Sequence, residues 1–335
     1  MRDDNNNIIL ILGHGRSGTT LLNKVLCSHP NIFIIGNEIN DLSFFHSNQH
    51  IYKKYGRRKY YMMIKDMYNH PDLRKNKKGI DDKNLKRFIK IHSLRDFFYE
   101  IFDLFRKKNK KNLIGIKISN NFAKNVDMIK DLFKCAYCIH IIRDPRDVFI
   151  SLRNTRFGTK SPFYAAKSWK YAIDKIRSLK TVNRRYYEIR YEKLISQPEK
   201  ELKKLCKFLN LEFSRNMLTF YKRTGKIPAH HKMLKQGFTK DNCNKWKKEL
   251  NKKELDLIYA AAGRKIYELG YSNKIIIKKI SLARRIKEFI YEKIHFSLRL
   301  FSSKETFKLI NGIYVIKTRL KRSMGLSKSA GTTNQ

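Results

Sequence analysis

Cysteine is scarce in this chain, and the cysteines present do not form the pattern of a disulfide framework. The 335 residues include five, at positions 27, 135, 138, 206 and 243. An odd number of scattered cysteines is typical of proteins in reducing compartments. Cys135 and Cys138 are spaced as Cys-x-x-Cys, but no second pair or histidine stands at ligand spacing from them, so we expect core packing there and no metal site.

Long apolar runs are also missing. No stretch reaches the roughly 18–20 apolar residues of a membrane-spanning helix. Residues Met1 to Asn7 are polar and acidic, and the short apolar run after them leads directly into a glycine-rich turn. This arrangement indicates a strand and not a signal peptide. We therefore expect a soluble, cytoplasmic protein.

Acidic residues are few: 29 Asp and Glu stand against 74 Lys and Arg, a formal net charge of +45. Such a charge indicates an anionic binding partner, such as nucleic acid, anionic lipid, an acidic glycan or an anionic cofactor. The alternative is a lysine-rich surface that is simply solvated. Aromatic residues make up 12% of the chain, which argues against global disorder. The length suits one large α/β domain with an appendage.

The most informative motif present lies between Ile8 and Leu22. Apolar residues 8–12 predict a buried strand, glycines at 13, 15 and 18 predict a tight turn, and a helix follows. The first amides of a helix have no partner within it and bind anions. Arg16, Thr19 and Thr20 add a guanidinium and two hydroxyls. The loop is therefore predicted to bind a phosphate or a sulfate.

This loop differs from the nucleotide P-loop, G-x-x-x-x-G-K-[ST]. Gly13 and Gly18 have its spacing, but Thr19 stands where a P-loop enzyme places the lysine that contacts the transferring phosphates. Arg-Ser-Gly-Thr-Thr after a hydrophobic strand resembles instead the 5′-phosphosulfate loop of sulfotransferases, which use 3′-phosphoadenosine 5′-phosphosulfate (PAPS). A P-loop-type kinase and a glycine-rich turn without a ligand are the alternatives.

Three later segments extend the resemblance in the order expected for that family. The apolar strand 138–142 leads into Arg143-Asp144-Pro145-Arg146-Asp147, and Ser151 follows Arg143 by eight residues. Arg190 to Leu194 with the run 201–211, and then 245–250 with 269–271, resemble the family's later motifs. The resemblance covers about residues 7–272 and is closer to glycan and tyrosine-protein sulfotransferases than to the cytosolic small-molecule type.

The resemblance implies a P-loop-like sulfotransferase fold and PAPS as co-substrate, with no metal. It assigns the 3′-phosphate to Arg143 and Ser151, where a guanidinium can bind bidentately, and brings Tyr191 near the adenine. Lys240 aligns loosely with a basic residue on the same phosphate. The residues expected to bind the 5′-phosphosulfate, through side chains and amides, are Arg16, Ser17, Gly18, Thr19 and Thr20.

Three residues are expected to act in catalysis. Arg16 neutralises charge at the 5′-phosphosulfate, and Lys117 resembles a lysine that some members place near the transferring sulfate, with a solvated strand-end lysine as the alternative. Glu38 resembles a glutamate in glycan and tyrosine-protein sulfotransferases, which makes it the candidate base, with pairing to Arg16 as the alternative. Other members of the family use a histidine as the base. His46, His50 and His92 are therefore alternative candidates for the base, although none of them has a matching motif around it.

Strands alternating with helices predict an α/β fold with a mostly parallel sheet. We expect strands at 8–12, 32–35, 113–118 and 138–142, and helices at 18–28, about 85–105 and about 123–133. Residues 1–272 are assigned to the sulfotransferase domain, with 39–110, which is otherwise irregular, as an insertion on the substrate side. Since ligands bind at the carboxyl ends of parallel strands, the site residues are expected to meet there.

Residues 273–335 extend beyond the resemblance. They hold 15 Lys and Arg against three Glu, a net charge of +12. Apolar residues recur at helical spacing from Leu282 to Leu298 with basic residues between them, which favours contact with an anionic membrane surface. The alternative is a helix packed on the domain with a solvated basic face. The end, residues 327–335, is small and polar and is expected to be disordered.

The sequence therefore predicts sulfuryl transfer from PAPS to a hydroxyl or amine, in line and with a carboxylate base. Basic and aromatic residues in 39–110 favour a carbohydrate or glycolipid acceptor. A non-enzymatic polyanion-binding protein is the other alternative, because lysines and aromatics interleave at 52–68. That alternative does not account for the ordered motifs, and no specific nucleic acid partner is expected.

Overall fold

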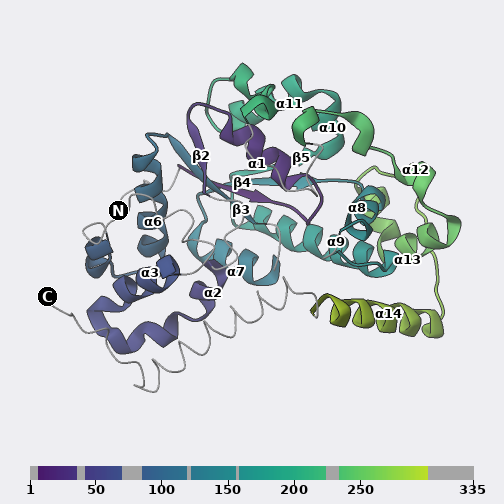
Figure 1. The fold of residues 1–335 in the computed structure, drawn as a ribbon, viewed down its shortest axis with the longest axis horizontal. Helices are drawn as coiled ribbons and strands as arrows, with labels where there is room; N and C mark the ends of the chain where they lie inside the picture. The colour runs from purple at the N-terminus through teal and green to yellow at the C-terminus, as the bar shows by residue number, and fades with distance from the viewer. Residues whose placement is uncertain are drawn as a thin grey trace, which may run out of the picture.

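A parallel sheet forms the centre of this protein. The computed structural model describes residues 7–35, 42–69, 85–118, 122–155, 158–223 and 234–300. Within them, the strand order is β2-β3-β1-β4-β5, and every pair is parallel (Figure 1). The strands are β1 (Ile8–Leu12), β2 (Ile32–Ile34), β3 (Leu113–Ile118), β4 (Tyr137–Ile142) and β5 (Tyr186–Arg190). The predicted fold class is confirmed.

Both faces of the sheet are covered, because successive residues of β1 enter two different hydrophobic cores. Ile8, Leu10 and Leu12 pack into one cluster, while Ile9 and Ile11 pack into the other. β1, β3 and β4 are buried along their whole length. Strands that are apolar on both sides need helices on both sides, which is why strands and helices alternate along the chain.

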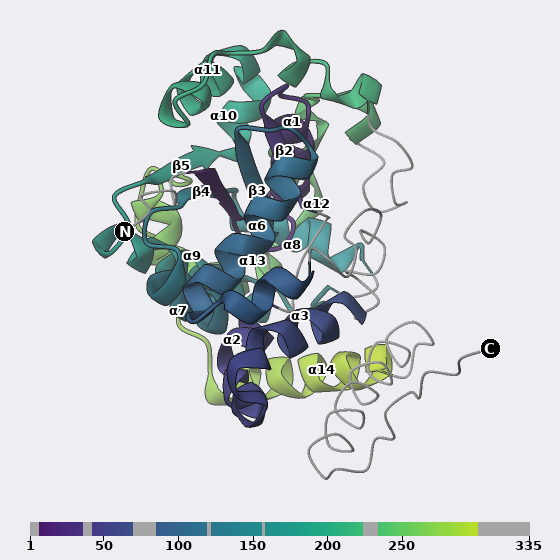
Figure 2. The same ribbon diagram turned by 90° about the vertical axis from the view of Figure 1, so that its left-hand side faces the viewer.

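Helices from distant parts of the chain supply these two layers (Figures 1 and 2). The core of Ile9 is shared by α1 (Thr19–Cys27), α10 (Tyr191–Ser196) and α11 (Pro198–Phe208). The core of Ile8 is shared by α6 (Leu94–Lys108), α7 (Phe122–Leu132) and α9 (Pro162–Arg177). A third cluster joins α9 to α8 (Pro145–Arg153) and α13 (Lys252–Glu268). Short 3-10 turns are η4 (Ser178–Thr181), η5 (Arg215–Met217), η6 (Phe220–Arg223) and η8 (Lys240–Asn242).

The segment 39–110 is mostly helical where it is described, and not irregular apart from one helix. Its elements are α2 (Leu42–Ser47), η2 (Gln49–Arg58), α3 (Lys59–Asn69), η3 (Arg87–Lys90) and α6. Aromatic side chains hold them together: the ring of Phe97 lies 5.4 Å from Tyr60 and 5.5 Å from Phe88. Lysines stand between these aromatic residues in the sequence. The aromatic rings pack inside, while the charged ends of the lysines stay in solvent.

The C-terminal part begins with α12 (Trp246–Glu249) and α13 and continues into α14 (Leu282–Leu300). The helical spacing predicted from Leu282 is therefore confirmed. None of the helices in the described ranges is long and apolar enough to cross a bilayer. Residues 301–335, with the end predicted to be disordered, lie outside the described residues.

Candidate active site

The glycine-rich turn joins β1 to α1 in a conformation that its residues dictate. Gly18 has φ 101°, and a Cβ there would stand 2.5 Å from Cδ2 of Tyr191. A Cβ on Gly13 would stand 2.7 Å from the carbonyl oxygen of Ile141. Arg16 also has positive φ, at 69°. Glycine at 18 is thus required both by the left-handed backbone and by the close approach of Tyr191.

The turn presents fewer free amides than the sequence indicates. The Ser17 amide donates to the carbonyl of His14 at 3.0 Å, so the expectation that it faces a ligand is wrong. The amides of Gly18, Thr19 and Thr20 stand at the helix start, where no preceding turn supplies carbonyls. The Ser17 hydroxyl is buried without a hydrogen-bond partner in the described structure.

Two arginines and a serine from three separate elements meet beside the turn. The Nε of Arg16 donates to Oγ of Ser151, on α8, at 2.9 Å. The Nη1 of Arg143, at the end of β4, donates to the carbonyl of Arg16 at 2.9 Å. The structure therefore brings together the three side chains that the sequence resemblance grouped around the two phosphate positions.

These residues line an open pocket with about 680 Å³ of empty space, including the part exposed to solvent. Among the residues predicted to bind, Ser17 does not line the pocket; those that do are Arg16, Gly18, Thr19, Thr20, Arg143, Ser151 and Tyr191.

One wall of the pocket was not foreseen from the sequence. It is formed by the segment before α12 and includes Leu234, Gly237, Thr239 and Asn242. Lys240, which aligned loosely with a phosphate ligand, is exposed and does not line the pocket, whereas its neighbours do. The sequence feature that could have indicated this wall is the motif at 245–250, which follows it directly.

The pocket is cationic and contains no carboxylate among its described lining residues. Burial, followed by the nearby Arg143, lowers the pKa of Arg16. An arginine stays protonated at neutral pH even so, because its ordinary pKa is far above 7. Two guanidinium groups held together in a half-enclosed space are stabilised by an anion placed between them.

Arg143 retains capacity for a ligand. Its Nη2 donates to the carbonyl of Asn242, and its Cζ lies 4.6 Å from the centre of the Tyr191 ring. Its Nε is buried and has no partner in the described structure. Buried polar atoms are nearly always satisfied, so this donor, in a residue that lines the pocket, fits a site that holds a polar anion.

Lys117 lies at the same edge of the sheet. It is 5% exposed, near the end of β3, and its Nζ lies 3.3 Å from Oγ1 of Thr20. The alternative of a solvated strand-end lysine is therefore wrong. Lys117, from the neighbouring strand, thus places its amine beside the start of α1. In a nucleotide P-loop the lysine comes from the helix itself, at the position that Thr19 occupies here.

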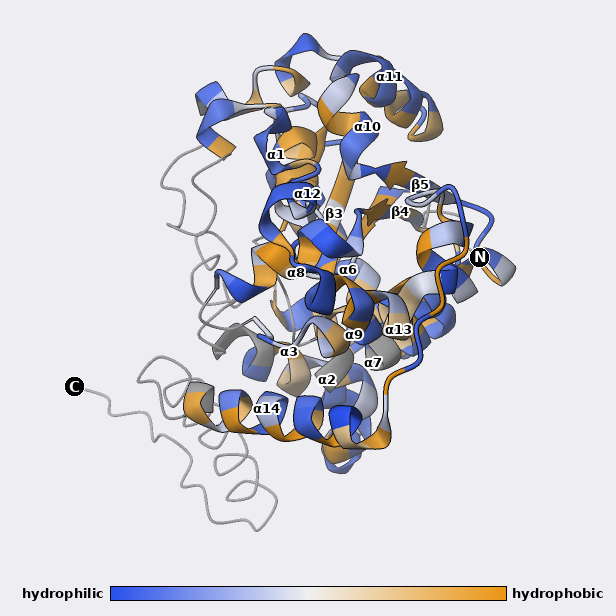
Figure 3. Ribbon diagram, turned by 90° about the vertical axis from the view of Figure 1, so that its right-hand side faces the viewer, coloured by the Kyte–Doolittle hydropathy of each residue, from blue (hydrophilic) through white to orange (hydrophobic). Residues whose placement is uncertain are grey.

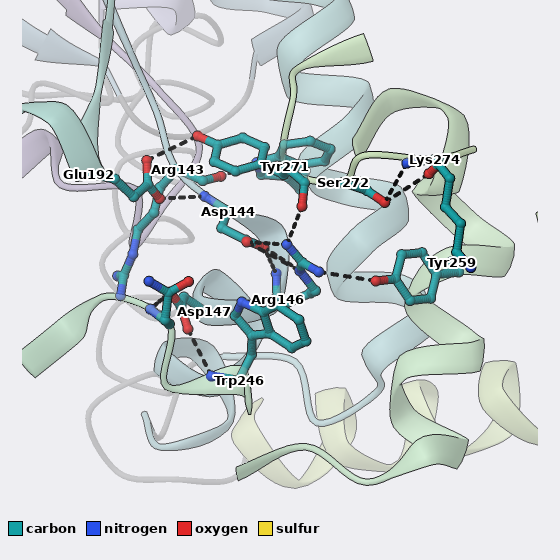
Figure 4. A network of polar contacts seen from close by, with 12 residues as sticks. Arg143, Asp144, Arg146, Asp147, Glu192, Trp246, Tyr259, Tyr271, Ser272 and Lys274 are labelled. Carbon is teal, nitrogen blue, oxygen red and sulfur yellow. Dashed lines mark hydrogen bonds and ion pairs between the residues drawn. The ribbon is translucent and has the colours of Figure 1, made fainter. Parts of the chain in front are cut away.

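The other charged residues of the Arg143-to-Asp147 motif hold the scaffold (Figure 4). Asp144 caps α8 and forms a two-pronged ion pair with Arg146, 2.6 Å at the closest atoms. Arg146 also donates to the hydroxyl of Tyr259 and to the carbonyl of Tyr271. These contacts tie the start of α8 to α13 and to the chain after it.

Asp147 fixes the segment that forms the unforeseen wall. Its carboxylate accepts hydrogen bonds from the amides of Asn244, at 2.7 Å, and Trp246, at 3.0 Å (Figure 4). Glu192, after β5, accepts from the amide of Asp144 and from the hydroxyl of Tyr271. Burial raises the pKa of both carboxyls, Asp147 and Glu192.

A histidine within the turn was overlooked by sequence reasoning. His14 is buried, with Nε2 3.1 Å from Oγ of Ser168 on α9 and Nδ1 2.9 Å from the carbonyl of Gly15. Burial lowers its pKa to about 4, so the ring is neutral at pH 7. A neutral ring with the proton on Nδ1 satisfies both contacts and holds the turn against α9.

The remaining candidates are not part of this pocket or are not described. Glu38, the candidate base, lies outside the described residues. His46 is 2.9 Å from a carboxylate oxygen of Asp131, and neither it, His50 nor His92 lines the pocket. Of the Cys-x-x-Cys pair, Cys138 is buried in β4 as expected, whereas Cys135 is exposed.

Comparisons with known proteins agree with this geometry. The sequence profile described as the sulfotransferase family matches residues 8–215. The structure is similar to the sulfotransferase domain of the olefin synthase from Synechococcus PCC 7002, with 21% identity, a TM-score of 0.51 and coverage of 75% of this chain and 92% of that one. It is also similar to the sulfotransferase domain from the curacin biosynthetic pathway, with 20% identity, a TM-score of 0.50 and coverage of 79% and 98%. No curated protein matches in sequence.

Proposed function

The chain belongs to the sulfotransferase family, and from this premise we propose that it moves a sulfuryl group from PAPS to a hydroxyl or amine of a carbohydrate or glycolipid. The observation that carries the proposal is the convergence of Arg16, Arg143 and Ser151 on one pocket, whose described lining residues include no carboxylate. Transfer of this kind depends on positioning and on charge stabilisation, which fixed cations and amides provide.

PAPS, when bound, supplies the sulfuryl group. The amides of Gly18 to Thr20 and the Arg16 guanidinium hold the 5′-phosphosulfate end in this proposal, since these residues line the pocket at the helix start. Arg143 and Ser151 hold the 3′-phosphate, and Tyr191 stands at the adenine side. The unpartnered Nε of Arg143 supports its role, because a phosphate oxygen would satisfy that donor.

Three residues are proposed for the chemical step. Arg16 and Lys117 stabilise negative charge at the turn, and the contact between Lys117 and Thr20 supports this placement. Glu38 removes the proton from the acceptor, a role motivated by its position in the sequence four residues after the end of β2. A carboxylate works best as a base when its pKa is raised toward neutrality, which burial favours and nearby cations oppose.

We propose a carbohydrate or glycolipid acceptor because aromatic and basic residues alternate along η2 and α3. Lys54 lies 5.3 Å from the centre of the Tyr55 ring, and Lys65 lies 4.9 Å from that of Tyr61; both rings are half-buried. Such surfaces suit sugar rings and anionic groups. A cytoplasmic location is proposed as well, supported by five free cysteines.

The first test is the binding of adenosine 3′,5′-bisphosphate, measured by titration calorimetry without magnesium. Arg143→Ala should bind about tenfold to a hundredfold more weakly than wild type, since a lost charge-assisted contact costs about 1.5–3 kcal/mol. Arg143→Lys should recover part of the loss. Arg264→Ala, on the exposed side of α13, is the matched control and should bind like wild type.

Competing ligands separate the alternatives in the same experiment. A P-loop kinase would prefer ATP and require magnesium, and a polyanion-binding protein would prefer single-stranded DNA. Equal affinity of wild type and Arg143→Ala for the bisphosphate would refute the cofactor assignment. The acceptor can be sought by incubating the protein and PAPS with a panel of oligosaccharides and glycolipids. Mass spectrometry would then detect the mass of one added SO3 group on the acceptor.

A further inference from the structure

Helix α14 is amphipathic, but it turns its polar side toward the protein and its apolar side toward solvent. Arg284, Glu288, Glu292 and His295 recur every three or four residues and are buried or half-buried. Large apolar side chains on the other side are exposed: Leu282 72%, Ile286 49%, Ile290 50%, Ile294 53% and Leu298 61%. Figure 3 shows hydrophobic residues, in orange, recurring along α14 at the edge of the molecule.

Specific polar contacts fix this orientation. The Ser161 hydroxyl, which caps the start of α9, donates to Oε2 of Glu288 at 2.6 Å. Thr159 donates to Glu292, and Arg284 pairs with Oε1 of Glu288 at 3.0 Å. Glu288 is 5% exposed. Rotating the helix to bury its apolar stripe would break the hydrogen bonds from Ser161 and Thr159, whereas the Arg284–Glu288 pair lies within the helix and would move with it. The contacts with Ser161 and Thr159 therefore orient the stripe outward.

Among the described residues of α14, the outward face carries cations and no carboxylate. Glu288 and Glu292 are the only acidic residues in the α14 sequence, and both belong to the side that faces the protein. Arg285, Lys287 and Lys293 are exposed beside the apolar stripe. The chain leading into the helix adds Ile275 and Ile277, which are 52% and 62% exposed.

We propose that this outward face of α14 lies on the surface of an anionic lipid bilayer. The helix does not qualify as a membrane span, so it would lie in the plane of the interface, with the apolar stripe among acyl chains and the cations at lipid headgroups. A second copy of this chain suits the face poorly. Pairing two such faces would oppose like charges without a carboxylate between them, in molecules of net charge +45 each.

The test is co-sedimentation of the full-length protein with vesicles of phosphatidylcholine, with and without phosphatidylserine. Wild type should bind only the vesicles that contain phosphatidylserine. The triple variant Ile286→Ser, Ile290→Ser, Ile294→Ser should lose about tenfold or more in apparent affinity, because its apolar stripe is removed. A matched triple, Tyr171→Ser, Val182→Ser, Tyr267→Ser, removes exposed apolar residues outside α14 and should bind like wild type.

A second measurement follows insertion directly. Ile290→Trp should shift its fluorescence to shorter wavelength on phosphatidylserine vesicles, while Val182→Trp should not. Salt of about 1 M, where the Debye length is about 3 Å, should release much of the bound protein. Absence of wild-type binding at low salt, or equal binding by the α14 triple variant, would overturn the proposal. So would a self-association, seen by sedimentation velocity, that the same triple variant abolishes, since it would assign the face to a second copy.

Discussion

At the scale of single residues, the turn from 13 to 18 combines backbone and side-chain requirements that act together. Gly18 has φ 101° and leaves the space that the Tyr191 ring occupies, and that ring in turn lies under the Arg143 guanidinium. One missing Cβ thereby sets the position of a cation at the end of β4, the strand that neighbours β1 in the sheet. The pocket depends on such pairs, and not on the glycine motif alone.

The base can be tested at this scale with Glu38→Gln. The amide is nearly isosteric with the carboxylate but cannot accept the proton, so turnover should fall about 10²- to 10⁴-fold. Binding of adenosine 3′,5′-bisphosphate should be unchanged. Transfer rates with PAPS and an identified acceptor provide the measurement, and Glu199→Gln, an exposed residue of α11, is the control. Near-wild-type turnover would move the search for the base to His46, His50 and His92.

At the scale of elements, the junction between β4 and α8 both lines the pocket and holds neighbouring elements in place. Arg143 faces the pocket, whereas Asp144, Arg146 and Asp147 bind the closing segment and α13. The wall that contains Thr239 and Asn242 has no strand or long helix of its own. Its position depends on hydrogen bonds to neighbouring elements, chiefly from Asn244 and Trp246 to Asp147.

Asp147→Asn should therefore loosen this wall. The substitution replaces one of two buried acceptors by a donor that opposes a backbone N–H, which costs about 1.5–3 kcal/mol of stability. Affinity for adenosine 3′,5′-bisphosphate should drop, and limited proteolysis should cut between residues 234 and 250 faster. Asp127→Asn, on the exposed face of α7, should change neither property. If the variant keeps full affinity and resistance, Asp147 does not position the wall.

At the scale of the whole molecule, buried neutral histidines couple stability to pH. His14 has its pKa lowered from 6.5 to about 4 by burial, and burial lowers the pKa of His140 as well. The unfolded chain binds protons at these sites first as pH falls. The contribution of His14 is thus fully present above about pH 6.5 and is lost progressively toward about pH 4, and that of His140 changes in the same direction.

The free energy of unfolding should accordingly fall on acidification, with His14 alone accounting for about 2 kcal/mol near pH 5. Urea unfolding at a series of pH values would measure this dependence. His14→Gln should lower stability at pH 7 but flatten the slope between about pH 6.5 and pH 4. His92→Gln, at an exposed position, should keep the wild-type slope. An unchanged slope in His14→Gln would show that His14 does not remain neutral in the folded protein.

The sequence by itself determined the features that depend on neighbours along the chain. An apolar run predicts β1, glycines predict the turn, and a strand followed by Arg143 and Ser151 predicts two donors at one strand end. Parallel-sheet geometry then requires such ends to meet at one edge. Periodicity also identified α14 as an amphipathic helix.

Only the tertiary structure decided what distant segments do to one another. It buried Lys117 against Thr20, joined His14 to Ser168 over 154 residues, and made residues 234–242 a pocket wall. It also chose which side of α14 faces the protein, through Ser161 and Glu288. Hydrophobic periodicity predicts that a helix has an apolar side, but not whether that side faces the protein or the solvent. Which side is buried depends on partners that the local sequence does not contain.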